Sequence, residues 1–263
     1  MEEIGVVESL KLFLLQIQDG WILFWKSISN VLAKPFYLQA TLEQLDHIGV
    51  GSLPVILLTS FFTGAVFALQ TSDILRQYGS TAQMGQLVSF TMIRELGPVL
   101  SALMFTGRVG AGIASELGGM VVSQQVDALR ALGTDYIKKL VTPRVLACLV
   151  SLPLLTGICD FVAIYSGQIL TTYQIKQNPH VYWSSVTQHL KMDDLYYSLF
   201  KAIAFAILIA VTACYQGLKT SGGTRGVGRS TTNAVMIASI LIIASDFFLT
   251  KLINVLISNA SYH

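Results

Sequence analysis

The stretch YYSLFKAIAFAILIAVTACYQG, residues 196–217, decides the fold class. A helix needs about 20 mostly apolar residues to cross a bilayer, and this stretch is long enough. Four further stretches are also long enough, at about 49–70, 86–107, 140–170 and 233–257. Because a backbone within lipid must satisfy its own hydrogen bonds, each stretch is expected to be a helix. The sequence therefore predicts an all-α integral membrane protein with five spans.

The composition supports this class, since 53% of the 263 residues are hydrophobic and 12% are charged. This charged fraction is about half of that in ordinary soluble domains. A net charge of +2 does not indicate a nucleic-acid partner. Cys148, Cys159 and Cys214 lie in or beside apolar runs. That placement favours small apolar side chains over disulfides or metal ligands, so no metal site and no cofactor is predicted.

The first 35 residues differ from the five spans because charged residues interrupt their apolar sequence. On a helical projection one side carries Glu8, Lys11, Gln18, Asp19, Lys26, Ser29 and Asn30. Trp21 and Trp25 suit the head-group boundary of a membrane. We predict an amphipathic helix in the membrane plane, within an interfacial region 1–48 that precedes a five-span domain 49–263. A sixth, weakly apolar span is the alternative.

Lysine and arginine residues indicate the orientation of the spans. The segments between spans two and three and between spans four and five are basic, and the N-terminal region adds three lysines. Basic segments remain on the inner side of a membrane. The N-terminal region and both basic segments are therefore predicted to be cytoplasmic, and the loop 172–195 and the C-terminus are predicted to lie on the opposite side.

The glycine-rich stretch SGGTRGVGRSTT, residues 221–232, nearly matches a phosphate-binding loop. That loop follows a buried strand and contains a lysine, whereas this stretch follows a membrane span and has Arg229 at the lysine position. We instead expect glycines with positive φ in a turn, and a cap for the fifth span from Ser230, Thr231 or Thr232. The glycines of this cytoplasmic loop are Gly222, Gly223, Gly226 and Gly228.

Two adjacent charged residues, Arg94 and Glu95, lie in the middle of the second span. Charges at that depth are expected to face protein or a water-filled cavity. Pro98 has no N–H for the Arg94 carbonyl, which leaves a free acceptor beside the charges. The pattern fits the wall of a polar-lined cavity, and a buried structural salt bridge to another helix is the alternative.

The segment after these charges predicts close helix packing and then an amphipathic helix. Small residues recur at intervals of four in two rows, which are Gly110, Ala114 and Gly118, and Ala111, Ser115 and Gly119. An apolar stripe follows, made of Val122, Val126, Leu129 and Leu132. Gly133 is expected to end this helix. The helix could dock a soluble partner or rest on the membrane.

Several motifs in order along the chain resemble those of one family. They are RELGPVLSAL, GRVGAGIASELGGM, QQVDALRALG, PRVLA, SGGTRGVGRSTT and SDFFLT. They are similar to the MlaE/YrbE family, the permease subunits of Mce-type ABC lipid transporters, with plastid counterparts. The resemblance implies a homodimer, a cytoplasmic ABC ATPase subunit, an Mce-domain lipid-binding protein and a cargo of phospholipid or similar lipid. The membrane would be a bacterial inner membrane or a plastid inner envelope membrane.

The same resemblance implies roles for single residues. Glu95 and Leu96 would line a lipid pocket at the dimer interface, with Arg94, Leu75 and Tyr78 nearby. A cytoplasmic coupling helix at about 118–132 would contact the ATPase. Its contact residues would be Glu116, Gln124, Gln125, Asp127 and Arg130. The chain departs from the family pattern at Gln124, where an acidic residue is usual, and at Tyr136, where proline is frequent.

Two other function classes remain as alternatives. An intramembrane aspartyl protease would use Asp160 and Asp246, since paired carboxylates can share a proton. The sequences around them, CDFVA and SDFFL, lack the flanking motifs of such enzymes. Each aspartate is expected instead to hydrogen-bond a neighbouring helix or to lie near the outer head groups. A membrane scaffold without transport activity is the other alternative. We expect a chain that is not itself an enzyme and has no catalytic residues.

Overall fold

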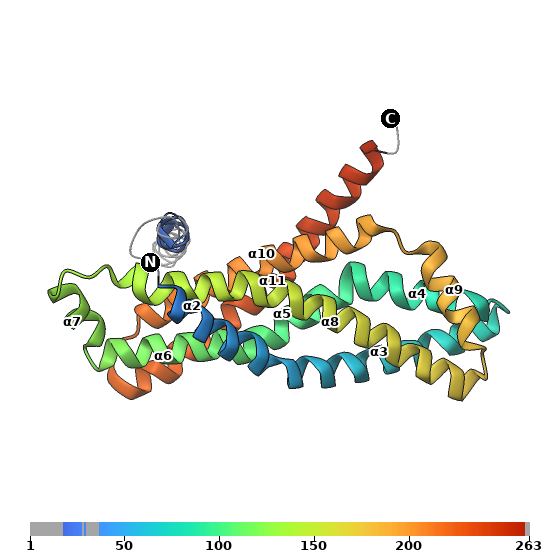
Figure 1. Ribbon diagram of the computed structural model, residues 1–263, viewed down its shortest axis with the longest axis horizontal. Helices are drawn as coiled ribbons and strands as arrows, with labels where there is room; N and C mark the ends of the chain where they lie inside the picture. Colours follow the sequence, from blue (N-terminus) through green and yellow to red (C-terminus); the bar gives the residue numbers. More distant parts are fainter. Residues whose placement is uncertain (1–17, 28, 30–36, 261–263) are drawn as a thin grey trace, which may run out of the picture. The chain divides into compact units, whose positions relative to one another are not determined.

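The structure is a computed structural model that describes residues 18–27, 29 and 37–260, without the side chains of residues 175 and 256–260. All regular elements in this part are helices (Figure 1). Within the described residues, five helices are long and apolar enough to cross a membrane, in agreement with the five predicted spans. They are Leu38–Gln77, Thr81–Val122, Ile137–Gln174, Met192–Leu218 and Gly223–Val255. The predicted division at residue 48 falls within the first of them.

The spans are made of α-helices joined in places by π-helical turns. The α-helices are α2 (Leu38–Leu45), α3 (Gly51–Gln77), α4 (Met84–Thr91), α5 (Gly97–Phe105), α6 (Ala111–Val122), α7 (Gln125–Ala131), α8 (Thr142–Ile175), α9 (Pro179–His189), α10 (Met192–Leu218) and α11 (Gly223–Ala260). The π-helical turns are Asp46–Val50, Met92–Leu96, Thr106–Gly110 and Ile137–Val141. A short 3₁₀ turn, Thr81–Gln83, precedes α4.

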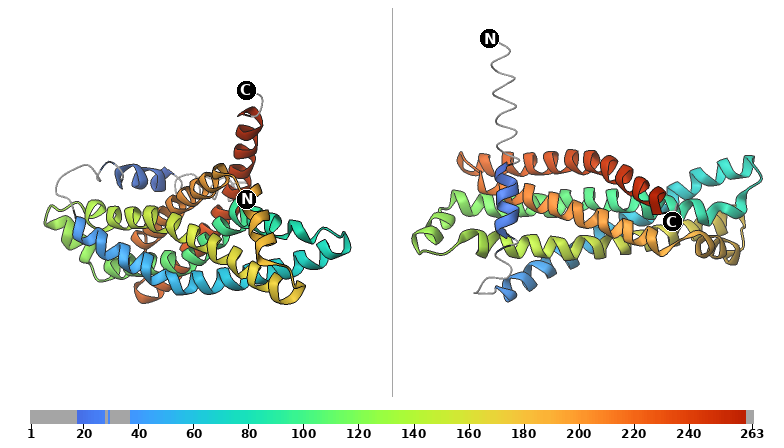
Figure 2. Two further views of the ribbon diagram at one scale, coloured as in Figure 1. Left: turned by 45° about the vertical axis from the view of Figure 1, so that its right-hand side comes forward. Right: turned by 90° about the horizontal axis from the view of Figure 1, so that it is seen from above.

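The chain forms two compact units, and α8, α10 and α11 contribute residues to both. Figure 2 shows the helices from two further directions. Unit 1 comprises the described part of Met1–Ile48 with Thr106–Leu149 and Ile207–Ile240. Unit 2 comprises Gly49–Phe105, Val150–Ala206 and the described part of Leu241–His263. The predicted cytoplasmic segments fall in unit 1, and the predicted outer loop falls in unit 2.

In unit 1, one of the two rows of small residues packs closely against α10. A Cβ on Gly118 would lie 2.7 Å from Thr220 Oγ1, and a Cβ on Gly217 would lie 3.0 Å from the Ala114 carbonyl oxygen. Ala114 is completely buried. The other row is more open, because a Cβ on Gly119 would have no neighbour within 4 Å. The predicted close packing is confirmed for the row Gly110, Ala114 and Gly118.

The described part of the N-terminal region, residues 18–27, is helical and belongs to unit 1. Leu23 and Phe24 are buried, whereas Trp21 and Trp25 are exposed, so this helix is amphipathic. Lys219 donates a hydrogen bond to the Tyr215 hydroxyl, and its Nζ lies 3.5 Å from Asp19 Oδ2. The Tyr215 hydroxyl and the Asp19 carboxylate raise the pKa of Lys219. The rest of the predicted interfacial helix lies outside the described residues.

The glycine loop differs in part from its prediction. Gly222 and Gly223 have positive φ angles of 86° and 67°, as expected for a turn. The helix α11 already begins at Gly223, so Gly226, Gly228 and residues 230–232 lie inside it and the predicted cap is wrong. Gly226 has a different role, because a Cβ there would overlap the Ser221 carbonyl group.

The loop predicted at 172–195 contains a helix, α9, that the sequence analysis missed. Asn178 caps it by accepting a hydrogen bond from the His180 N–H at 2.9 Å, and Pro179 is its first residue. This helix packs on α4 within unit 2 (Figure 1). Tyr182 is buried there and donates a hydrogen bond to the Ile164 carbonyl at 3.0 Å. Burial raises the pKa of Tyr182.

The contact between α4 and α9 predicts a stability effect at Gly85. A Cβ on Gly85 would overlap the Tyr182 carbonyl group, so Gly85→Ala is expected to lower the unfolding free energy by about 1–3 kcal/mol. Thermal unfolding of the purified protein in detergent measures the effect. Gly157→Ala is the matched control, since a Cβ on this helical glycine meets nothing within 4 Å. Equal unfolding temperatures for the two variants would contradict the assignment.

Candidate functional site

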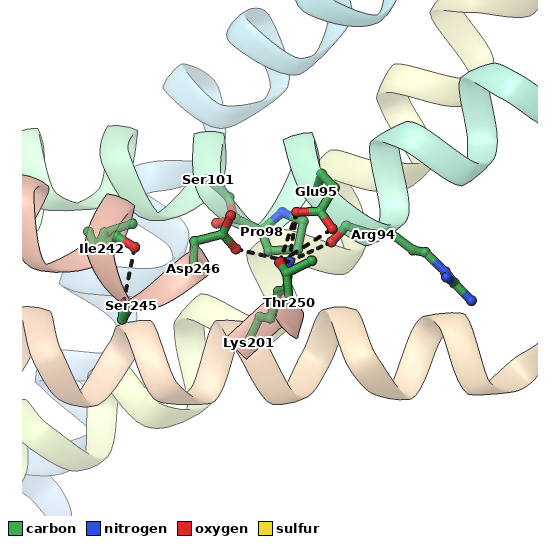
Figure 3. Close-up of polar contacts among 9 residues, drawn as sticks. All are labelled: Arg94, Glu95, Pro98, Ser101, Lys201, Ile242, Ser245, Asp246 and Thr250. Carbon is green, nitrogen blue, oxygen red and sulfur yellow. Dashed lines mark hydrogen bonds and ion pairs between the residues drawn. The ribbon is translucent and has the colours of Figure 1, made fainter. Parts of the chain in front are cut away.

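A buried lysine is the centre of a polar cluster in unit 2. Only 2% of the Lys201 side chain is exposed, and its Nζ lies 2.9 Å from both Glu95 Oε2 and Asp246 Oδ1 (Figure 3). The same nitrogen donates to Thr250 Oγ1 at 2.8 Å and to the Arg94 carbonyl at 2.9 Å. We call Glu95, Lys201, Asp246 and Thr250 the Lys201 cluster. It joins the second, fourth and fifth spans.

The local backbone explains why the Arg94 carbonyl can accept this bond. In an α-helix that carbonyl would bond the N–H of residue 98, but Pro98 has none. Residues Met92–Leu96 form a π-helical turn directly before it, a local irregularity that is frequent at functional sites. The predicted free acceptor beside Pro98 is confirmed, and its partner is Lys201.

Arg94 and Glu95 form separate ion pairs, although they are adjacent in the sequence. The Arg94 guanidinium lies 2.5 Å from Asp194 Oδ1 and 4.4 Å from the centre of the Phe90 ring. It points away from Glu95 (Figure 3). Asp194 and Lys201 both belong to α10. The salt bridges to another helix that the sequence analysis held as an alternative are therefore present, while 41% of the Glu95 side chain remains exposed.

Leu96, the residue that follows Glu95, lines an apolar groove. Leu96 lines a cleft of about 380 Å³ with Phe62, Thr63, Val66, Phe67 and Gln70. A second cleft of about 270 Å³ shares Phe62 and Thr63 with it and extends along α3 and α5. Both clefts belong to unit 2, and we call them together the Leu96 groove. Its lining is predominantly apolar, which suits acyl chains.

The structure does not bring all of the residues implied by the resemblance to this site. Leu75 is buried in the core of unit 2 and does not line the described part of the groove. Tyr78 is 77% exposed at the end of α3. Of these residues, Leu96 lines the groove, and Glu95 directly precedes it in the chain and belongs to the Lys201 cluster. Leu75 and Tyr78 do not line the described part of the groove.

The sequence predicts no role for Lys201 or Thr250. For Asp246 it offers a protease role, a hydrogen bond to a neighbouring helix or a place near the outer head groups. A signal was available, because an ionisable residue inside an apolar span indicates a functional site and a nearby partner. Lys201 lies within the quoted fourth span. The sequence alone does not identify the carboxylates that approach it.

The arrangement of Asp160 and Asp246 differs from that of a protease pair. Asp246 pairs with Lys201, and Asp160 accepts a hydrogen bond from Ser198 Oγ at 3.0 Å. A Cβ on Gly97 would overlap Asp160, so this carboxylate lies directly against the helix backbone. Each of the two carboxylates has its own partner, which does not support a shared proton.

The predicted coupling helix at 118–132 is wrong as a single element. The helix α6 ends at Val122, and Gln124 has a left-handed φ of 60° before α7 begins at Gln125. Gly133 ends α7 as predicted. It has a φ of 71°, its N–H bonds the Arg130 carbonyl at 3.0 Å, and the Thr134 N–H bonds the Leu129 carbonyl at 3.0 Å.

The residues expected to contact an ATPase belong to unit 1, and most are exposed. Asp127 and Arg130 form an exposed pair at 3.2 Å on α7. Arg130 also lies 4.4 Å from the centre of the Tyr136 ring. Gln124 and Gln125 are exposed. Glu116 differs from these, because its Oε2 lies 2.8 Å from the buried Arg144 guanidinium and neutralises it.

The chain is similar to known membrane transport proteins over most of its length. The chain matches the family Permease MlaE over residues 41–252. It is 41% identical to a "Probable ABC transporter permease protein" of Rickettsia typhi, over 86% of this chain and 88% of the relative. It is 36% identical to "Protein TRIGALACTOSYLDIACYLGLYCEROL 1, chloroplastic" of Arabidopsis thaliana, over 85% of this chain and 64% of the relative. It is 30% identical to "Intermembrane phospholipid transport system permease protein MlaE" of Haemophilus influenzae, over 89% of each chain.

The Lys201 cluster predicts a large effect of removing its cation. Lys201→Met leaves Glu95 and Asp246 without their partner, and loss of one member of a buried ion pair costs about 3–5 kcal/mol. We expect a lower unfolding temperature and a lower yield of folded protein in detergent. Lys191→Met, at an exposed position, is the control and should retain both.

A triple variant separates charge from packing. Adding Glu95→Gln and Asp246→Asn to Lys201→Met removes the unpaired carboxylates and should recover part of the lost stability. No recovery would show that the ion pairs do not account for the effect of Lys201→Met.

Proposed function

The chain belongs to the MlaE permease family, and we propose that the Lys201 cluster and the Leu96 groove form its lipid site. The chain is the membrane-spanning permease subunit of an ABC transporter that moves phospholipid or a similar lipid. It resides in a bacterial inner membrane or a plastid inner envelope membrane. ATP is hydrolysed by a separate cytoplasmic subunit, and we propose that this chain has no catalytic role of its own.

The observation that carries the lipid site is the half-exposed Glu95 beside an apolar groove. Glu95 lies at membrane depth with 41% of its side chain accessible, and the next residue lines the groove. A charged group at that depth is unfavourable unless protein or a polar ligand shelters it. A lipid head group near Glu95, with its acyl chains along the groove, provides that shelter.

A second copy of the chain would complete the site. Five spans are too few to enclose a two-chain lipid, so we propose a homodimer that covers the accessible side of Glu95. An Mce-domain lipid-binding protein across the membrane would exchange lipid with this dimer. Support comes from the exposure of Glu95 and from the family membership.

We propose that α7 and the exposed residues around it receive the ATPase. Gln124, Gln125, Asp127 and Arg130 offer polar and charged groups there. Glu116 is accessible on one side and tied to the buried Arg144 on the other. A displacement of the ATPase on binding ATP would move this segment as a rigid body and shift the population of lipid-site conformations.

Glu95 is the residue that tests the lipid site. Glu95→Ala is expected to lower ATP-dependent lipid transfer by about tenfold, since a hydrogen bond to a charged group contributes ~1.5–3 kcal/mol. Transfer between proteoliposomes and acceptor vesicles measures this rate. Binding of the ATPase subunit, measured by co-purification, should be unchanged.

The control is Glu43→Ala, which removes an exposed carboxylate of α2 in unit 1. Its transfer rate should equal that of the unchanged protein. Transfer at the full rate by the Glu95→Ala variant would contradict the proposed lipid site. Absence of ATP-dependent transfer by the unchanged complex would favour a scaffold.

Substitutions on α7 are expected to weaken ATPase binding and to leave lipid binding unchanged. The double substitution Asp127→Ala and Arg130→Ala removes two exposed charges and should weaken co-purification of the ATPase subunit by about tenfold, a change of ~1.4 kcal/mol. Lipid that co-purifies with the chain should be retained. Loss of lipid with intact ATPase binding would contradict this assignment.

A further inference from the structure

The hydrogen-bond donors of Lys201 are completely used within the protein. An ammonium group has three N–H donors, and Lys201 donates three hydrogen bonds, to Arg94 O, Glu95 Oε2 and Thr250 Oγ1. Asp246 Oδ1 lies 2.9 Å from the same nitrogen as an ion-pair partner that accepts no hydrogen bond from the described residues. With 2% of the side chain exposed, Lys201 is not accessible to a ligand. It therefore has no donor for the phosphate of a lipid.

The other cation near the site, Arg94, also has a carboxylate partner within the protein. The Arg94 Nε donates to Asp194 Oδ1 at 2.7 Å, and a terminal nitrogen of Arg94 lies 2.5 Å from the same oxygen. The remaining Asp194 oxygen accepts from the Lys191 backbone N–H at 3.1 Å. Arg94 also lies over the Phe90 ring. Its side chain points away from Glu95 (Figure 3). Its charge is neutralised away from the Lys201 cluster.

The carboxylates, in contrast, retain accessible acceptor capacity. Glu95 is 41% exposed and Asp246 is 20% exposed. Each carboxylate offers about four lone-pair positions. The bonds from Lys201 and Thr250 fill only part of those of Glu95, and Asp246 Oδ1 is buried beside Lys201 without accepting a hydrogen bond within the described part of the chain. Arg94, Lys201, Glu95, Asp194 and Asp246 together carry a net charge of −1. The accessible charge of the site is therefore negative.

An excess negative charge at membrane depth is stabilised by a cation that binds there. The Leu96 groove beside it accepts apolar chains, so this cation should be part of an amphiphile. We infer that the site selects lipids whose head group carries an ammonium group, and disfavours anionic head groups that lack one. The ammonium would donate to Glu95 and Asp246, with the acyl chains in the Leu96 groove. This inference rests on the proposed lipid site.

Lipid binding to the purified full-length chain tests the selectivity. The probes are dioleoyl phosphatidylethanolamine, its N-acetyl derivative and dioleoyl phosphatidylglycerol, each competing with a fluorescent phospholipid. The acyl chains are identical, and N-acetylation converts the ammonium group into a neutral amide while the phosphate is kept. We expect the ethanolamine lipid to bind about tenfold more tightly than the other two, because a charge-assisted hydrogen bond is worth that factor or more.

Conservative variants connect the selectivity to the carboxylates. Glu95→Gln and Asp246→Asn keep the side-chain size and remove one negative charge each, so each should reduce the tenfold preference towards equal binding. Asp193→Asn, at an exposed position outside the Lys201 cluster, is the control and should keep the preference. Unfolding temperatures identify any variant that fails to fold. The comparison of the three lipids on the unchanged chain tests the selectivity without any variant.

Two negative results have different meanings. Equal binding of all three lipids, as expected if a proton or an inorganic cation neutralises the site, would overturn the ammonium inference and leave the proposed lipid site intact. A preference unchanged in both carboxylate variants would also overturn it. Absence of competition by every lipid would overturn the proposed lipid site itself.

Discussion

The buried ammonium group of Lys201 is the interaction on which the rest of unit 2 depends. It binds the backbone of the second span at Arg94 and the side chains of Glu95, Asp246 and Thr250. Apolar burial is non-directional and leaves the register between uniformly apolar helices weakly defined. A charge at membrane depth is strongly unfavourable without partners. Three spans must therefore keep the one arrangement that brings three hydrogen-bond acceptors and a second carboxylate to a single nitrogen.

Unit 1, considered by itself, follows the same principle with a different cation. The buried Arg144 guanidinium donates to the Glu116 carboxylate at 2.8 Å and to the Leu140 carbonyl at 2.6 Å. Around it, helices approach closely where Gly118 and Gly217 have no side chain. Each unit thus combines a neutralised buried cation with glycine contacts, and both features are typical of packing within membranes. Polar pairs specify the arrangement, and small residues allow the helices to approach.

The sequence was sufficient for features that depend on local chemistry. The five spans follow from apolar length, the end of α7 follows from Gly133, and the free Arg94 carbonyl follows from Pro98. The features it did not predict depend on contacts distant in the chain or on competing local conformations. The partners of Lys201, Thr250 and Glu95, lie about 50 and 100 positions away in the chain, so the sequence near Lys201 does not identify them. The left-handed Gln124 divides a segment whose apolar periodicity favoured one continuous helix.

The separation between a buried cation and accessible carboxylates has a consequence for transport. A site must bind its cargo firmly enough to load and weakly enough to unload. Because Lys201 is already fully bonded, its ion pairs need not break when a lipid leaves. In the proposed lipid site, only the exposed parts of Glu95 and Asp246 would change their surroundings between the loaded and unloaded states. The structural charge pairs could then remain fixed through the cycle, while movement driven by the ATPase would act on the accessible carboxylates and the groove.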